Sequence, residues 1–370
     1  MRESMYDKDP AVLKTKLENG ALYPNPESFD EFHLPIPSDN QLKEQISLNG
    51  RELPLDNPKS ADIPGLIDQL CQSAHHYIRT ASYSMGLKAQ QMALKLSYRH
   101  FGYGSDNYIE VLFWVALYYH KLLRYNPAEK LYLLVLRNRQ EALGKRNPRL
   151  SPYVNNLGRF YKDTERYKPA EKLLLQSLQF EQEMTPNSTN VADRLNNLAS
   201  LYTKQGKYSL ALDYSHKALA IFSTSDHHHR DEHVALMQNN MGALYTKLGN
   251  LNQAEIMLEA ALDYRLETCQ PKSLELAGVY INYYQLAFAR HDYDSALDYA
   301  RRCLRCAFFA YGMNNLLYAQ ALMAIGDVYC HIDCFDKALL CWNQAHSSLE
   351  GVVSSKHPTR IKLLGRLRLV

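Results

Sequence analysis

Large and small residues recur along the chain with a period of 41 to 43 residues. A large side chain opens each period, at Tyr83, Tyr125, Tyr167, Tyr208, Leu251, Tyr293 and Phe335. Small residues follow three positions later, at Gly86, Ala128, Ala170, Ala211, Ala254, Ala296 and Ala338. Within a period the apolar residues fall at helical spacing on two stretches, which a short polar turn such as residues 204–207 separates. The pattern therefore predicts two antiparallel helices in each period.

Neighbouring helix pairs are expected to stack, because a pair this short cannot bury its apolar face alone. The small residues let the two backbones of a pair approach, while aromatic rings fill the remaining space at the crossing. The second helices are expected to stop at one phase of the repeat, near Gly102, Gly144, Pro186 and Gly312. The sequence thus predicts an all-α solenoid of about seven helix-turn-helix repeats over residues 61–358.

The repeat resembles the tetratricopeptide repeat, and the resemblance covers about residues 63–355 in seven consecutive units. That family usually has a period of about 34 residues and a proline at the end of the second helix. No proline stands at that position here, so the second helix can continue for about two more turns. The longer period and the amino-acid sequence of residues 195–208 are similar to those of the kinesin light chain variety of the repeat. The resemblance implies a right-handed superhelix that binds proteins.

The two ends of the chain lack the repeat. Residues 1–60 are expected to form an extended arm, because the first 64 residues hold eight of the fifteen prolines. This arm has none of the heptads with which kinesin light chains form a coiled coil. Residues 359–370 have room for one helix only, so we expect a capping helix or a partial eighth repeat there.

An asparagine recurs on the expected inner side of the first helices, at Asn156, Asn197, Asn240 and Asn282. An amide offers one donor and one acceptor group on a short side chain, so a column of asparagines can bind the main chain of an extended peptide. Asparagine could instead be tolerated at a half-exposed site, but its poor helix propensity weighs against four repetitions. Proteins with tetratricopeptide repeats also hold peptides through asparagines at this position, as the resemblance implies. A second set, Asn155, Asn196 and Asn239, is less expected to face the ligand.

Basic residues stand near the asparagines on the same expected face. Lys121, Lys204 and Lys247 lie seven residues after the asparagine position, and Arg159 lies one helical turn away. These charges favour an acidic partner segment through long-range attraction, although a solvated charged face is the alternative. The arm carries aromatic residues among carboxylates in residues 24–35. We hypothesise that this arm occupies the groove as an internal ligand, against the alternative that it packs elsewhere.

Composition narrows the remaining classes of function. The net charge is +3, with 42 basic and 39 acidic residues, so the chain has no global field for nucleic acid or anionic lipid. The sequence contains no apolar run long enough for a membrane span and no signal peptide, so we expect a cytoplasmic protein. Seven cysteines in such a chain are expected to be reduced thiols.

Metal and catalytic chemistry find little support in the spacing of residues. Cys303 and Cys306, with Cys330 and Cys334, superficially resemble a zinc pattern, but Cys303 occupies a small packing position of the repeat. His227–His229 with His233 fall in a connection between repeats, where a solvated loop is the default. No Gly-rich phosphate loop and no marked catalytic set is present. We expect no metal, no cofactor and no enzymatic activity.

These observations predict an adaptor or scaffold for protein–protein interaction that binds an extended, acidic peptide segment in its concave groove. The alternative is a structural scaffold that binds partners by its convex face or its ends and self-associates through its C-terminal cap.

Overall fold

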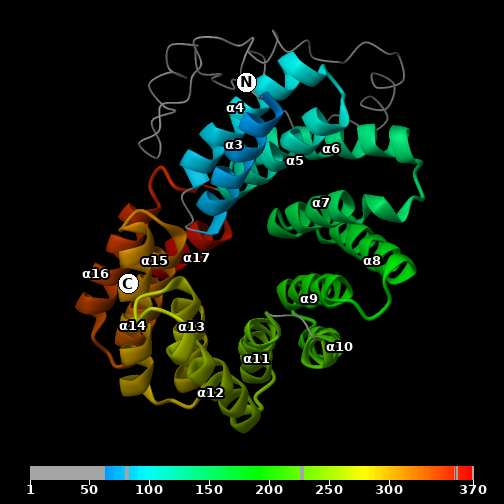
Figure 1. The fold of residues 1–370 in the computed structure, drawn as a ribbon. Helices are drawn as coiled ribbons and strands as arrows, with labels where there is room; N and C mark the ends of the chain where they lie inside the picture. The colour runs from blue at the N-terminus through cyan, green and yellow to red at the C-terminus, as the bar shows by residue number, and fades with distance from the viewer. Residues whose placement is uncertain (1–62, 80–82, 226–228, 354, 356, 369–370) are drawn as a thin grey trace, which may run out of the picture. The chain divides into compact units, whose positions relative to one another are not determined.

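The computed structural model describes residues 63–79, 83–225, 229–353, 355 and 357–368. Across these residues it contains helices and turns but no strand (Figure 1). The first helices of the repeats are α3 (Ile63–Arg79), α5 (Asp106–Lys121), α7 (Ser151–Asp163), α9 (Thr189–Lys204), α11 (Arg230–Lys247), α13 (Leu274–Ala289) and α15 (Leu316–His331). The second helices are α4 (Tyr83–Phe101), α6 (Tyr125–Leu143), α8 (Tyr167–Met184), α10 (Tyr208–Thr224), α12 (Leu251–Thr268), α14 (Tyr293–Tyr311) and α16 (Phe335–Leu349). A 3-10 turn, η2 (Pro148–Leu150), precedes α7, and α17 (Pro358–Leu367) ends the described chain.

The predicted all-α solenoid of about seven helix pairs is confirmed. The chain divides into two compact units, and the boundary follows Val115 within α5. In the first unit α3 packs against α4, and Gln90 Nε2 of α4 donates to the carbonyl oxygen of Val111 on α5 over 3.4 Å. In the second unit each helix packs against the next, from α7 to α17.

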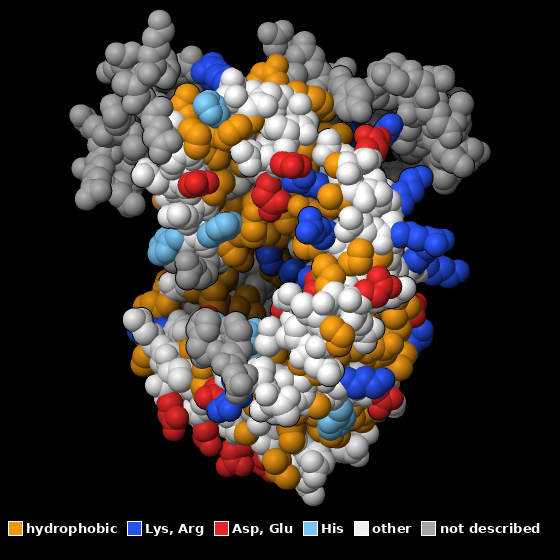
Figure 2. Space-filling view, turned by 45° about the vertical axis from the view of Figure 1, so that its right-hand side comes forward, with side chains coloured by type: hydrophobic (Ala, Val, Ile, Leu, Met, Phe, Trp, Pro, Cys, Tyr) orange, Lys and Arg blue, Asp and Glu red, His pale blue; other side chains and the backbone are white. Residues whose placement is uncertain are grey.

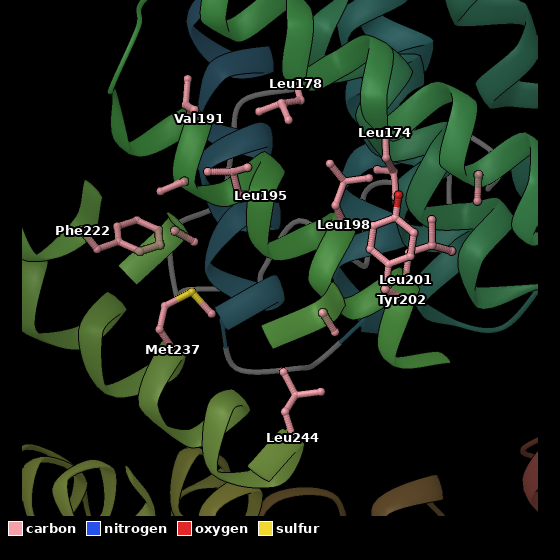
Figure 3. Close-up of a cluster of buried hydrophobic side chains, with 14 residues drawn as sticks. Leu174, Leu178, Val191, Leu195, Leu198, Leu201, Tyr202, Phe222, Met237 and Leu244 are labelled. Atoms are coloured by element: carbon pink, nitrogen blue, oxygen red, sulfur yellow. The ribbon is translucent and has the colours of Figure 1, made fainter. Parts of the chain in front are cut away.

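The core of the second unit crosses the boundaries between repeats. Figure 3 shows Leu174 of α8, Leu198 of α9, Phe222 of α10 and Met237 of α11 among the side chains of one buried cluster. Leu174, Leu198 and Met237 are fully buried, and Phe222 is nearly so. Because the same cluster serves consecutive repeats, each repeat depends on its neighbours for burial.

Small residues fix the distance between the two helices of a repeat. The alanines three positions into the second helices are fully buried, as the sequence predicts. Glycines hold the facing position on some first helices, where a Cβ on Gly158 would lie 2.9 Å from Leu174 and one on Gly326 would lie 2.5 Å from Trp342. A larger residue at these glycines would push the helices apart.

The turns within the second to seventh repeats share one backbone conformation. Residues two positions before the second helix have a positive φ between 58° and 79°: Leu123, Glu165, Gly206, Gly249, His291 and Asp333. The N–H of the next residue donates to a carbonyl five residues earlier, as from Arg166 to Tyr161 over 2.8 Å. This Schellman-type closure ends the first helix and reverses the chain.

The second helices end where the sequence predicts. α4, α6 and α14 stop immediately before Gly102, Gly144 and Gly312, each of which has a positive φ. α8 stops at Met184, two residues before Pro186. These second helices are therefore longer than those of the 34-residue repeat, because no proline ends them at the earlier position.

The last helix packs on the seventh repeat. Leu363 of α17 is fully buried in a cluster that contains Trp342 of α16. Arg366 of α17 forms a two-bond ion pair with Asp327 of α15, at 2.6 Å for each nitrogen–oxygen distance. Trp342 Nε1 donates to the same carboxylate over 3.2 Å.

Some expectations fall on residues outside the described part of the chain. These are the N-terminal arm over residues 1–60 and the histidines at positions 227 and 228. None of the described helices is both long enough and apolar enough to cross a membrane.

Candidate functional site

The four asparagines of the predicted site lie on consecutive first helices: Asn156 on α7, Asn197 on α9, Asn240 on α11 and Asn282 on α13. Each side chain is half-buried. We call this set the asparagine column. Leu157, Leu198, Met241 and Tyr283, the residues that follow, are buried, so the column lies beside the core and not within it.

Three members of the column join consecutive repeats. Asn197 Nδ2 donates to Asn155 Oδ1 over 2.9 Å, and Asn240 Nδ2 donates to Asn196 Oδ1 over 3.3 Å. Asn282 Nδ2 donates to Asn239 Oδ1 over 2.9 Å and approaches the backbone oxygen of Asn239 at 3.3 Å. The second set of asparagines therefore supplies the acceptors for the column. Their recurrence was visible in the sequence, but this role was not predicted.

The bonds between repeats leave part of each amide available. Among the described residues, no donor reaches Oδ1 of Asn197, Asn240 or Asn282. The amides of Asn197 and Asn240 each use one N–H, whereas that of Asn282 has two acceptors on Asn239. Asn156 differs, because its Nδ2 donates to the carbonyl oxygen of Pro152 over 2.9 Å and its Oδ1 accepts from Arg159. The column thus retains acceptors and donors that a bound main chain can use.

Trp114 and Ala324 replace asparagine in the second and seventh repeats. Trp114 is half-buried, and its ring meets the edge of His75 with centroids 4.3 Å apart. Ala324 is buried, with 4% of its surface exposed. The asparagine column is therefore confined to α7, α9, α11 and α13.

A group of basic side chains surrounds Asp163 near the ends of the first helices. Lys162 Nζ donates to Ser200 Oγ on α9 over 2.9 Å and lies 3.6 Å from Asp163 Oδ1. His120 Nε2 lies 3.2 Å from Asp163 Oδ2. Lys121, Arg159, Lys162 and Lys204 make up what we call the basic cluster. The sequence predicted three of these residues and missed Lys162, which stands seven residues after Asn155 as Lys204 stands seven after Asn197.

The pKa shifts follow from burial and from this crowding of charge. Burial lowers the pKa of Lys121, and the nearby Arg159 lowers it further. Burial also lowers the pKa of Lys162. The charge of Asp163 opposes this decrease, whereas the charges of Arg159 and Lys204 add to it. Burial alone would raise the pKa of Asp163, but the hydrogen bond from His120 and the charge of Lys162 bring it to about 2.

Two opposing effects act on the pKa of His120, which is lowered on balance. Burial lowers its pKa, and the hydrogen bond to Asp163 only partly offsets this effect. The Tyr132 hydroxyl lies 3.4 Å from His120 Nδ1, where it can donate to a neutral ring that is protonated at Nε2. Lys247, the remaining predicted residue, is exposed at the end of α11 and lies outside the hydrogen bonds and ion pairs described for the basic cluster.

A buried polar network fixes α9 beside α7 and α8. Glu181 Oε1 lies 3.0 Å from Arg194 Nη2 and accepts a hydrogen bond from Ser151 Oγ over 2.7 Å. Glu181 and Ser151 are almost completely buried. Breaking such a pair leaves a buried charge without compensation, so the network holds the first helices of the third and fourth repeats in register.

Two of the seven cysteines, Cys303 and Cys306, are buried, and the other five are half-buried. Cys303 is fully buried at the small position of its repeat, and burial raises its pKa to about 12. Within the described ranges, no group of three histidine, cysteine, aspartate or glutamate side chains could hold a metal ion. On the face drawn in Figure 2, basic, acidic and apolar side chains are interspersed.

The comparisons with known proteins agree with this repeat architecture. The tetratricopeptide repeat model matches residues 149–224 and 233–307. No curated protein matches the chain in sequence. A Rap protein complexed with competence and sporulation factor is 13% identical, with 96% of this chain and 92% of that chain covered and a TM-score of 0.61. NprR in complex with its cognate peptide NprX is 17% identical, with 84% of each chain covered and a TM-score of 0.56.

The fold is therefore that of an all-α tetratricopeptide repeat solenoid. A kinesin light chain-type repeat structure from Podospora anserina is 15% identical, with 56% of this chain and 99% of that chain covered and a TM-score of 0.45. This match is too distant to support the kinesin light chain subclass, which stays a prediction.

Proposed function

We propose that this chain is a non-catalytic adaptor that binds an extended, acidic peptide segment of a partner protein along the first helices of its repeats. The asparagine column carries the proposal, because Asn197, Asn240 and Asn282 on consecutive first helices each keep an open acceptor, and Asn197 and Asn240 also keep an open donor. The basic cluster supports the acidic character of the ligand. NprR, which shares the fold, was solved with a peptide, and this agrees with the kind of ligand proposed.

Useful affinity requires both the asparagine column and the basic residues near it. Three amide contacts to a peptide main chain contribute roughly 2–4 kcal/mol at about 1 kcal/mol each. That sum alone corresponds to binding of roughly millimolar strength or weaker. Charge complementarity at Arg159, Lys204 and Lys247, together with side-chain pockets, supplies the remainder.

A selection of displayed random peptides against the whole chain tests this function. We expect enrichment of sequences rich in aspartate and glutamate. A variant with Arg159→Glu and Lys204→Glu should lose these peptides, since each change reverses a charge beside the column. The matched control carries Lys168→Glu and Lys172→Glu, two exposed lysines on the second helix α8.

Equal recovery by the groove variant and the wild type would contradict the proposal and favour binding by the convex face. Circular dichroism should first show that both variants are folded. Alanine at the asparagines is a weaker test, because Asn197, Asn240 and Asn282 also hold repeats together.

The N-terminal arm remains the candidate for an internal competitor. If residues 24–35 occupy the groove, a chain without residues 1–60 should bind the selected peptides more tightly than the whole chain. Unchanged affinity would remove this hypothesis.

A further inference from the structure

The basic cluster has more positive charge than its surroundings neutralise. Asp163 is its nearest carboxylate, and both oxygens of Asp163 already face His120 and Lys162. Among the described residues, no carboxylate lies within ion-pair distance of Lys121, Arg159 or Lys204. In the part of the chain that the structure describes, Asp163 alone lies within ion-pair distance of the basic cluster, while Asp193 attracts Arg159 from farther away. The positive charge of the cluster therefore still exceeds the negative charge around it.

This excess is costly because two of the cations are removed from water. Lys162 is 8% exposed, and Lys121 is half-buried. Arg159 lowers the pKa of both lysines after the larger effect of burial, which means that the positive groups repel one another. An anion that binds here relieves both the desolvation and the repulsion.

Asp163 and its partners give the site a fixed frame. Ser200 holds the Lys162 ammonium at 2.9 Å, and His120 holds the second oxygen of Asp163. Asn156 accepts from Arg159 Nη1 over 3.4 Å, which leaves the other guanidinium donors open. The open donors of Arg159 thus come from a side chain that Asn156 already positions.

The number of charges points to the chemistry of the ligand. A single peptide carboxylate has one charge and two oxygens, whereas a phosphate monoester has nearly two charges and three acceptor oxygens. Arginine binds a phosphate group through two parallel N–H bonds, and a lysine adds a third contact as a point charge. We propose that Lys121 and Arg159 bind a phosphate monoester carried by the partner segment, with the charge of Lys204 adding to the attraction.

This inference rests on the proposed function, since it names a group within the acidic peptide. Three degenerate peptide libraries test it, identical except for a fixed central residue: phosphoserine, glutamate or serine. Each library is passed over the immobilised whole chain at fixed ionic strength. We expect the phosphoserine library to be retained about tenfold more than the glutamate library, because one further charge-assisted hydrogen bond corresponds to about that factor.

Variants distinguish a specific phosphate site from non-specific electrostatic attraction of acidic peptides. Arg159→Gln should reduce retention of phosphoserine peptides to the level of glutamate peptides, and Lys121→Gln should do so in part. Lys168→Gln on the exposed side of α8 is the matched control and should change nothing. If Arg159→Gln does not fold, as judged by circular dichroism, Lys121→Gln alone decides the result. Competition by inorganic phosphate, but not by acetate, would further support a site for the phosphate group.

Equal retention of the phosphoserine and glutamate libraries by the wild type would overturn the inference. The proposed function would then stand, provided that both libraries exceed the serine library and depend on Arg159. Retention of all three libraries at one level would remove the acidic peptide as the ligand and the phosphate site with it. A phosphoserine preference that survives Arg159→Gln and Lys121→Gln would also overturn the assignment of the site.

Discussion

The junctions between the middle repeats differ in chemistry from the junction at the C-terminal end. On α9, α11 and α13 the joining residue is an asparagine whose amide donates to an asparagine of the preceding repeat. On α17 the same register position is held by Arg366, which stands 42 residues after Ala324. Arg366 uses two nitrogens on Asp327, each at 2.6 Å.

The difference shows how one position can serve packing alone or packing and recognition together. An amide satisfied by one bond still has a free acceptor, whereas the ion pair directs two donors of the arginine at one internal carboxylate. The middle junctions therefore combine a bond between repeats with amide groups that stay open for the proposed ligand. The terminal junction gains strength and gives up those open groups.

Removal of the terminal ion pair should have the largest effect. Arg366→Ala leaves Asp327 with Trp342 as its partner, and we expect α17 to open more easily by about 2 kcal/mol. Hydrogen exchange of the α17 amides measures this opening. Arg302→Ala, which removes an exposed i,i+4 pair with Asp298, is the control and should cost about 0.5 kcal/mol or less. Unchanged protection of α17 would show that its packing and not the ion pair holds it.

A double-mutant cycle should give a smaller energy for an amide junction. We expect Asn155→Ala and Asn197→Ala to be coupled by about 1 kcal/mol, the usual net value of one hydrogen bond. Denaturant unfolding of the two single variants and the double variant provides the coupling. Asn155→Ala with Asn240→Ala makes no direct bond and should give a value near zero. If the two pairs give the same coupling, the amide bond does not join the repeats.

Acid should weaken the third repeat more than the amide junctions. The third repeat contains the carboxyl group of Asp163, which titrates, whereas the asparagine amides do not. The folded pKa of Asp163 is about 2, below its ordinary value, through the charges of its partners and despite burial. Its contribution is therefore present above about pH 4 and is lost as the pH falls towards 2. The side chain is 38% exposed, so solvent screening should keep this contribution below about 1 kcal/mol. Stability measured between pH 4 and pH 2 should fall less steeply in Asp163→Asn than in the wild type.

Salt should have the smallest effect and should separate the two kinds of junction. Between 0.1 M and 1 M sodium chloride, we expect the protection of α17 to fall by about 0.5 kcal/mol, because its ion pair is only partly buried. Amides at the asparagine junctions should keep their relative protection. A loss of equal size along the whole solenoid would indicate a general effect of salt on packing.

The architecture was predictable because its determinants are periodic. Ala170, Ala211 and Ala254 recur at one phase and are fully buried, so burial could be inferred from spacing alone. The ends of the second helices could be predicted equally well, since Gly102, Gly144 and Gly312 adopt the positive φ that glycine favours.

The side-chain contacts of the candidate site were harder to predict from the sequence. The column at Asn197, Asn240 and Asn282 was visible as a repeat, but its bonds to the preceding helix depend on the rotation between neighbouring helices. The partnership of Lys162 with Ser200, and that of His120 with Asp163, each involve residues that do not recur. Such contacts arise from three-dimensional proximity, which periodicity does not encode.

The direction of the amide bonds bears on how such a chain can change its length. Each middle repeat contributes one acceptor and one donor, always in the same order along the chain. Excision of residues 197–239 would place Asn240 opposite Asn155 and leave Asn196 to accept from Asn282, so no amide would lose its counterpart. Duplication of the same segment would add one matched pair. The middle of the molecule can thus gain or lose whole modules without breaking the amide pairing, and the Asp327–Arg366 pair lies outside the exchanged segment.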